Sequence, residues 1–190
     1  MPDNRRAAIL AAALAEFDVK GLYGARMDDI ALAAGLSKGS IYRYFPDKNR
    51  LFAETIRATL NDTIARGGGG AQHDRQLFLR WIWKVASEPR FQAAYRLSLT
   101  QDPALGDITH DMTILIENAF AKPLATLLGQ TERESHLPED SAQIRARLTI
   151  STLLGAALMG ANTPFFLDSG VAFLLRACEL DAQSPQADGY

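Results

Sequence analysis

The chain has 190 residues, of which 47% are hydrophobic, so it is long enough to form one domain or two small ones around a buried core. Lysine and arginine total 20 and aspartate and glutamate total 22, which gives a net charge of −2 at pH 7. This balance excludes a protein that coats nucleic acid through bulk positive charge. Nucleic acid is therefore a partner only if the positive charge is concentrated locally.

The single cysteine, Cys178, excludes an intrachain disulfide and a cysteine-rich zinc site, and it favours a reducing compartment. The chain contains no run of about 20 apolar residues, so no membrane-spanning helix is expected. Its N-terminal apolar stretch resembles a short signal peptide, but Ile9, Ala13 and Phe17 share one helical face, which favours an amphipathic helix. We therefore expect a cytoplasmic protein.

Nearly every periodic segment has helical spacing and no hairpin signal is present, so the predicted fold class is all-α. Ser37 and Asp47 are the expected N-caps of the third and fourth helices. Gly35 and Pro46 are expected to separate the short helices, and a glycine loop over 21–24 to end the first. The first four helices are predicted over about residues 3–20, 27–34, 37–44 and 47–65.

Four consecutive glycines, Gly67 to Gly70, are the clearest linker signal, because each glycine costs a helix about 1 kcal/mol relative to alanine. Beyond them, helices are predicted over about 74–87, 91–101, 107–130, 139–162 and 165–181. The expected organisation is a helix-turn-helix domain, a connecting helix, a linker, a ligand-binding and dimerisation domain and a flexible tail, over 1–50, 51–66, 67–73, 74–181 and 182–190.

The charge divides near the same boundary. Residues 1–50 carry eight basic and six acidic side chains, whereas residues 51–190 carry 12 and 16, so the net charges are +2 and −4. Within Ser37 to Arg50 the net charge is +3. The positive charge is therefore local, and it coincides with the short predicted helices.

The segment from Met27 to Phe52 has the pattern of two short helices joined by a tight turn. Ile30, Ala31 and Ala34 form the apolar face of the first helix, and Gly35 fits a left-handed turn position without strain. The second helix turns Ile41 and Phe45 inward at i, i+4 spacing. The outward positions are then Lys38, Gly39, Ser40, Tyr42 and Arg43, and the pattern is that of a helix-turn-helix.

The outward residues have the chemistry that reads a DNA major groove. Lys38 and Arg43 can donate to guanine O6 and N7, Ser40 can donate or accept, and Gly39 permits a close backbone approach. Tyr42 is better suited to a phosphate than to a base edge. Lys48, in the first turn of the next helix, can share a phosphate with the free backbone N–H groups there.

The first fifty or so residues resemble the DNA-binding domain of the TetR/AcrR family of bacterial transcriptional regulators. The matching positions are Phe17, the glycine loop at 21–24, the runs 29–31 and 34–45, Lys48 and Leu51. The resemblance implies that the recognition helix meets DNA through Lys38, Gly39, Ser40, Tyr42 and Arg43, that Tyr44 touches the DNA backbone and that Lys48 binds phosphate. Family members often carry Thr or Ser where this chain has Arg26, which can make a charged phosphate contact instead.

The rest of the chain resembles the family in layout only. The resemblance implies a diverse helical domain that binds a small molecule and dimerises through its last two long helices. The large side chains expected to line an apolar pocket are Phe78, Trp81, Phe91, Tyr95, Met112 and Phe120. For each of them taken singly, a place in the ordinary core is the alternative.

Two stripes at helical spacing are expected at a dimer interface formed by four helices. The first consists of Leu148, Thr152, Gly155 and Met159, and the second of Phe173, Leu174 and Ala177. Burial of both stripes within one protomer is the alternative.

The sequence contains no nucleophile elbow, phosphate-cradling loop or metal-spaced cluster, so it predicts no enzyme, cofactor or metal site. The predicted function is a ligand-responsive transcriptional regulator. It is expected to be a repressor that binds a palindromic operator in double-stranded DNA as a homodimer and is released by a small apolar effector. The alternative is a helical small-molecule-binding protein whose helix-turn-helix does not bind DNA.

Overall fold

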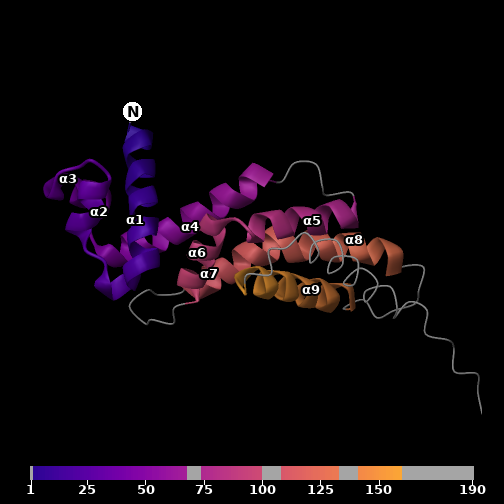
Figure 1. Ribbon diagram of the computed structural model, residues 1–190. Coiled ribbons are helices and arrows are strands. Elements are labelled where there is room, and N and C mark those ends of the chain that lie inside the picture. The colour runs from indigo at the N-terminus through magenta and orange to yellow at the C-terminus, as the bar shows by residue number, and fades with distance from the viewer. Residues whose placement is uncertain (1, 68–73, 100–107, 133–140, 160–190) are drawn as a thin grey trace, which may run out of the picture. The chain divides into compact units, whose positions relative to one another are not determined.

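The computed structural model describes residues 2–67, 74–99, 108–132 and 141–159, and every regular element in these ranges is helical (Figure 1). The all-α fold class is therefore confirmed. Packing divides the chain into two compact units, of which the first comprises residues 1–66 and 88–115 and the second residues 67–87 and 116–190. The predicted bounds of the five domains remain a prediction, and the predicted helix over 165–181 and the tail lie outside the described residues.

The first unit contains six helices among its described residues. They are α1 (Pro2–Gly24), α2 (Met27–Ala33), α3 (Lys38–Tyr44), α4 (Lys48–Gly67), α6 (Pro89–Ser98) and α7 (Ile108–Ile116). In α1 the predicted apolar face is buried, and the ring of Phe17 meets that of Phe52 of α4 edge to face with centroids 4.9 Å apart. We call the three helices α1 to α3 the head. The contact between Phe17 and Phe52 joins the first helix of the head to the long α4.

The regular first helix ends at Lys20, as predicted, although the segment α1 extends to Gly24. The chain kinks at Gly21, whose φ of 66° lies in the left-handed region that glycine enters without a Cβ clash, and it then makes one more turn to Gly24. Gly21 therefore interrupts the helix as predicted, but a short helical turn takes the place of the predicted glycine loop.

The turn between α2 and α3 is fixed by backbone hydrogen bonds. Gly35 has φ 69°, as predicted, its N–H donates to the Leu32 carbonyl at 3.0 Å, and the Leu36 N–H donates to the Ala31 carbonyl at 2.9 Å. This is the Schellman arrangement that satisfies the last carbonyls of a helix. Because Ile30 and Ala31 are also buried, the angle between the two helices is set by backbone and core together.

The two predicted N-caps have different outcomes. Asp47 Oδ1 accepts from the Arg50 backbone N–H at 2.7 Å, so the predicted cap of α4 is confirmed. Ser37 occupies the N-cap position of α3 with extended backbone, but its side chain makes no cap hydrogen bond. Its hydroxyl instead pairs with the Ser40 hydroxyl at 2.8 Å, so the prediction that its side chain caps the helix is wrong.

The start of α6 lies at Pro89, two residues earlier than predicted. Proline is favourable in the first helical position because its missing N–H has no helical partner there. The Glu88-Pro89 pair thus separates two helices, as predicted, and its proline is also the first residue of α6.

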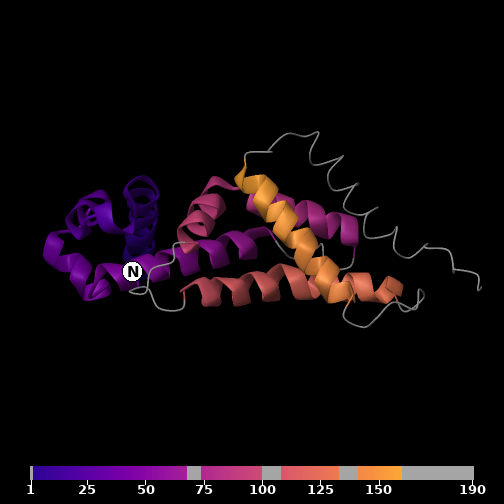
Figure 2. The same cartoon turned by 90° about the horizontal axis from the view of Figure 1, so that it is seen from below.

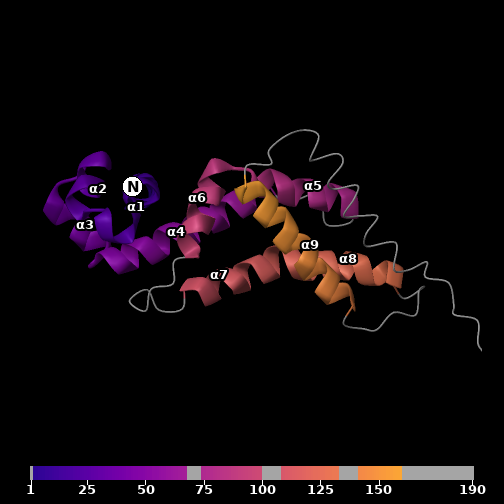
Figure 3. The same cartoon turned by 60° about the horizontal axis from the view of Figure 1, so that its bottom comes forward.

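The described residues of the second unit form α5 (Arg75–Ala86), the π-helical turn η2 (Glu117–Ala121), α8 (Lys122–Glu132) and α9 (Ser141–Leu158). Asp74 caps α5 by accepting from the backbone N–H groups of Gln76 and Leu77 at 2.7 and 3.0 Å. α5, α8 and α9 contact one another, and α9 runs obliquely across α8 (Figures 2 and 3). The core between them is apolar and includes Phe78 and Leu153.

The predicted helix over 107–130 is confirmed as an unbroken helical segment over 108–132, within which a π-helical turn leads from α7 into α8. There the Lys122 N–H donates to the Glu117 carbonyl, five residues earlier. The cause lies in Pro123, which has no N–H to offer and whose ring would meet the Ala119 carbonyl in a regular α-helix. Widening the helix at this turn relieves that clash.

None of the helices in the described ranges is long and apolar enough to cross a membrane.

Candidate nucleic-acid interface

Helix α3 presents one apolar and one polar face. Ile41 and Phe45 are fully buried against the rest of the head, as predicted. Lys38, Tyr42 and Arg43 are exposed, with 43% of Tyr42 accessible. The helix is therefore held by two residues and offers polar, basic and aromatic groups to the outside.

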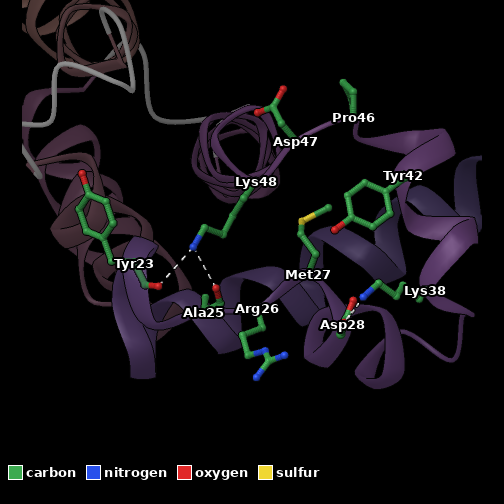
Figure 4. A pocket seen from close by; sticks show the side chains of 10 residues that line it. All are labelled: Tyr23, Ala25, Arg26, Met27, Asp28, Lys38, Tyr42, Pro46, Asp47 and Lys48. Carbon is green, nitrogen blue, oxygen red and sulfur yellow. Dashed lines mark hydrogen bonds and ion pairs between the residues drawn. The ribbon is translucent and has the colours of Figure 1, made fainter.

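A shallow pocket of about 490 Å³ opens beside this face (Figure 4). We call it the α2–α3 pocket. It is lined by the end of α1, the start of α2, α3 and the start of α4, through Tyr23, Ala25, Arg26, Met27, Asp28, Lys38, Tyr42, Pro46, Asp47 and Lys48. Four of the eight predicted DNA contacts lie around it, with three cations against two carboxylates.

Lys48 has a structural role that sequence reasoning missed. Its Nζ donates to the backbone carbonyls of Tyr23 at 3.3 Å and Ala25 at 3.0 Å (Figure 4). A cation in the first turn of a helix is unfavourable, but here the ammonium meets carbonyls where α1 ends, which are electronegative. An ammonium has three donors, so one N–H remains for a phosphate.

Lys38 is paired with a carboxylate that sequence reasoning left without a role. Its Nζ lies 2.8 Å from Asp28 Oδ2 of α2 (Figure 4). The hydrogen bond to Asp28 raises the pKa of Lys38 above its ordinary value, so the side chain is charged at neutral pH. The only sequence signal for this partner was the acidic pair that opens α2, and that pair is also what a helix N-terminus favours.

The remaining predicted DNA contacts differ in their exposure and in the hydrogen bonds that their side chains already make. Arg26 is exposed at the N-cap position of α2 and makes no side-chain cap, as expected for arginine. Tyr44 is half-buried, and the Ser40 hydroxyl is engaged with Ser37. A Cβ placed on Gly39 would meet no atom within 4 Å, so packing does not explain a glycine in this helix.

The end of α3 is tied to its neighbours by Arg6. Its guanidinium lies over the Phe45 ring, 4.9 Å from the centroid, and forms an ion pair with Glu54 of α4. The recognition helix is thus braced from α1 and α4 while its outer face stays accessible.

Comparison with known proteins agrees with this geometry. Residues 9–55 match the profile of bacterial regulatory proteins of the tetR family. The transcriptional regulator RutR of Escherichia coli K12 is 39% identical over 61 residues, which are 32% of this chain and 29% of RutR. The transcriptional regulator BetI of Vibrio campbellii is 32% identical over 191 residues, which cover 96% of this chain and 94% of BetI.

This chain belongs to the TetR family. It is a transcriptional regulator with a DNA-binding helix-turn-helix. The crystal structure of NalD, the secondary repressor of the MexAB-OprM multidrug efflux pump in Pseudomonas aeruginosa, has the same fold. It superposes with a TM-score of 0.66 at 20% identity over 94% of this chain and 96% of NalD.

Outside the TetR-type head, the six predicted pocket residues fall into two groups. In the second unit the Trp81 ring lies between Phe78 and Phe120, with centroids 5.2 and 5.3 Å away. In the first unit Phe91 stacks on Tyr95 at 5.9 Å, and Met112 of α7 is buried. The rings therefore form two clusters, one in each unit.

The first predicted dimer stripe lies on the exposed side of α9. Leu148 is 63% and Met159 88% exposed, Thr152 is exposed and Gly155 is half-exposed. Ile144, also exposed, extends the stripe by one turn. The second stripe, Phe173, Leu174 and Ala177, lies outside the described residues.

Proposed function

We propose that this TetR-family regulator is a repressor that binds a palindromic operator as a homodimer and is released by a small apolar effector. The observation that carries the DNA-binding part is the polar outer face of α3, held by the fully buried Ile41 and Phe45. A helix fixed from one side can enter a major groove with the other. Occupation of promoter DNA by such a dimer represses by excluding the polymerase.

Each outward residue has a proposed task. Lys38 and Arg43 donate to base edges, with Ser40 as a further polar contact. Gly39 lets the helix backbone approach the DNA, which agrees with the open space around it. The phosphates are bound by Arg26, Tyr42, Tyr44 and Lys48.

The proposed dimer uses the exposed stripe of α9. Leu148 and Met159 are large apolar side chains left uncovered on a helix whose other face is buried, and two such faces can cover each other in a symmetric interface. Each protomer then places its α3 in one half-site, with the two half-sites about 34–36 Å or a multiple apart.

The proposed effector binds at the aromatic rings of the second unit. Trp81 supports this, because its Nε1 is buried and has no hydrogen-bond partner in the part of the chain that the structure describes. A buried indole N–H without an acceptor is costly. An effector with an apolar body and one acceptor atom would satisfy it.

The signal reaches the head, we propose, through the packing of α4, α6 and α7 in the first unit rather than through the predicted glycine linker. Arg96 of α6 pairs with Asp18 of α1 at 2.9 Å, and Arg57 of α4 pairs with Asp111 of α7. These ion pairs connect helices of the predicted effector domain with helices that carry the DNA-binding head. Replacement of Gly67 to Gly70 by alanine should accordingly leave induction intact.

A gel-shift titration at low salt with the DNA flanking its own gene tests the proposed function. We expect the fragment to shift at lower protein concentration than a shuffled duplex of equal length. Transcription in vitro from that fragment should fall as the protein is added. A folded dimer that shifts neither duplex would contradict the proposal and favour a small-molecule-binding protein with an inactive helix-turn-helix.

A further inference from the structure

Asp28 is an acidic residue at the place where the proposed function needs positive charge. It lines the α2–α3 pocket together with the cations Arg26, Lys38 and Lys48. Its carboxylate lies 2.8 Å from the Lys38 ammonium, across the angle between α2 and α3 (Figure 4). A carboxylate on a surface that faces phosphates weakens binding to every DNA sequence, so its presence calls for an explanation.

The ion pair is not needed to build the helix-turn-helix. The turn is already fixed by the backbone hydrogen bonds of Gly35 and Leu36 and by the buried Ile30 and Ile41. The Lys38 side chain is 68% and the Asp28 side chain 36% exposed, and pairs with such exposure contribute little to stability because water screens them. The role of the Lys38–Asp28 pair is therefore to be found in what the outer surface binds rather than in the stability of the fold.

We propose that Asp28 is a positioning residue that sets sequence specificity, holding the Lys38 ammonium in one place on the DNA-facing surface and opposing sequence-independent binding. The proposal rests on the proposed assignment of Lys38 to a base edge. A lysine ammonium is a mobile point charge on a flexible stem, and left alone it binds whichever phosphate is near. With one donor on Asp28, its remaining N–H groups point to a defined position, where they suit an acceptor such as guanine O6 or N7.

The neighbouring residue Asp29 provides a matched control. It lies in the same first turn of α2, so both carboxylates interact similarly with the helix N-terminus. Its side chain is 45% exposed and its partner is Lys20, at 3.2 Å, outside the residues that line the α2–α3 pocket. Asp28→Asn and Asp29→Asn therefore remove the same charge from the same helix and differ in which lysine they release.

The experiment measures dissociation constants of the full-length chain for the fragment flanking its gene and for a shuffled duplex, at two salt concentrations. For Asp28→Asn we expect tighter binding to the shuffled duplex, by about twofold, because one carboxylate near the phosphates is gone. The ratio of the dissociation constants for the shuffled duplex and the flanking fragment should fall about five- to tenfold, because Asp28 no longer holds the Lys38 ammonium in place. Asp29→Asn should change the ratio less than about twofold, because it leaves the Lys38 pair in place.

Combination with Lys38→Ala separates the two proposals. If Asp28 acts through Lys38, Asp28→Asn has no further effect on the ratio in the Lys38→Ala background. Equal ratios for Asp28→Asn and Asp29→Asn, with a lowered ratio for Lys38→Ala, would overturn the role of Asp28 and leave the proposed function standing. An unchanged ratio for Lys38→Ala itself would instead overturn the assignment of Lys38 to DNA.

Discussion

The head and the second compact unit use their distinctive side chains in opposite ways. In the head and at the start of α4, short polar contacts hold the cations: Lys38 pairs with Asp28, and Lys48 donates to two backbone carbonyls. In the second unit the distinctive side chains are aromatic rings packed on one another, with Trp81 between Phe78 and Phe120. The head exposes its charged side chains, whereas the second unit packs its aromatic rings against one another.

This difference decides how far each region can be understood from its sequence. A helix-turn-helix is a short motif in which the residues that fix the angle and those that face outward lie close together along the chain, so the pattern alone separates Phe45 from Tyr42. A buried ring serves a hydrophobic core and a ligand pocket equally well. The sequence therefore predicts which residues of α3 face outward, whereas for the aromatic rings of the second unit it leaves core and pocket as alternatives.

The largest expected effect comes from comparing the two faces of α3. Phe45→Ala removes a fully buried ring and should lower the free energy of unfolding by about 3–5 kcal/mol. Tyr42→Ala, on the exposed face, should lower it by less than about 1 kcal/mol. Thermal unfolding followed by circular dichroism measures both. Equal losses would mean that α3 has no distinct outer face.

The next effect tests whether the exposed stripe of α9 is an interface. Leu148→Asp places a charge in the proposed apolar contact and should weaken dimerisation by at least about 2 kcal/mol. Leu77→Asp, on the exposed side of α5, is the matched control, because Leu77 is 55% exposed but is not part of the stripe. Sedimentation velocity should show monomers for the first variant only. Dimers that persist in Leu148→Asp would place the interface elsewhere.

A smaller effect distinguishes phosphate contacts from base contacts. Lys48→Ala should weaken binding to the flanking fragment and to a shuffled duplex alike, roughly threefold, and lower the slope of log K against log salt by about 0.9. Lys20→Ala is the matched control, because it also removes one positive charge, from a lysine that pairs with Glu16 and Asp29. Fluorescence anisotropy on labelled duplexes measures both variants. A selective loss on the flanking fragment would assign Lys48 to the bases.

The smallest effect concerns ion pairs in the two units. Arg96→Ala breaks the pair between α6 and α1, and Arg147→Ala breaks the pair with Glu117 in the second unit. Both arginines are at least half exposed, so each loss should lower the Tm only slightly at low salt, and less at high salt. Only Arg96→Ala should also alter the DNA affinity of the head. Identical DNA affinity in both variants would remove the Arg96 pair from the proposed route of coupling.

Several features of the fold and the site lay beyond sequence reasoning for physical reasons. At Gly21 and before Pro123 the backbone departs from α-helical geometry and then returns to it. Whether the helix continues past such a point depends on packing against neighbouring helices, which the local sequence does not contain. The Lys38–Asp28 pair joins residues ten positions apart across a turn, so neither helical spacing nor composition reveals it. Asp47 as a cap and Gly35 as a left-handed turn were predictable, because both follow from local backbone geometry.

The central claim is that the outer face of α3 reads bases, and one matched pair of variants tests it most directly. Arg43→Ala removes a proposed base contact, whereas Arg50→Ala removes the same charge from α4, where the side chain is 64% exposed and lies near Glu54. The quantity to measure is the ratio of dissociation constants for the shuffled duplex and the fragment flanking the gene. We predict that Arg43→Ala lowers this ratio about 5- to 150-fold, which corresponds to a loss of about 1–3 kcal/mol in discrimination, and that Arg50→Ala leaves it within about twofold of the unaltered chain. Equal ratios for the two variants would contradict the claim.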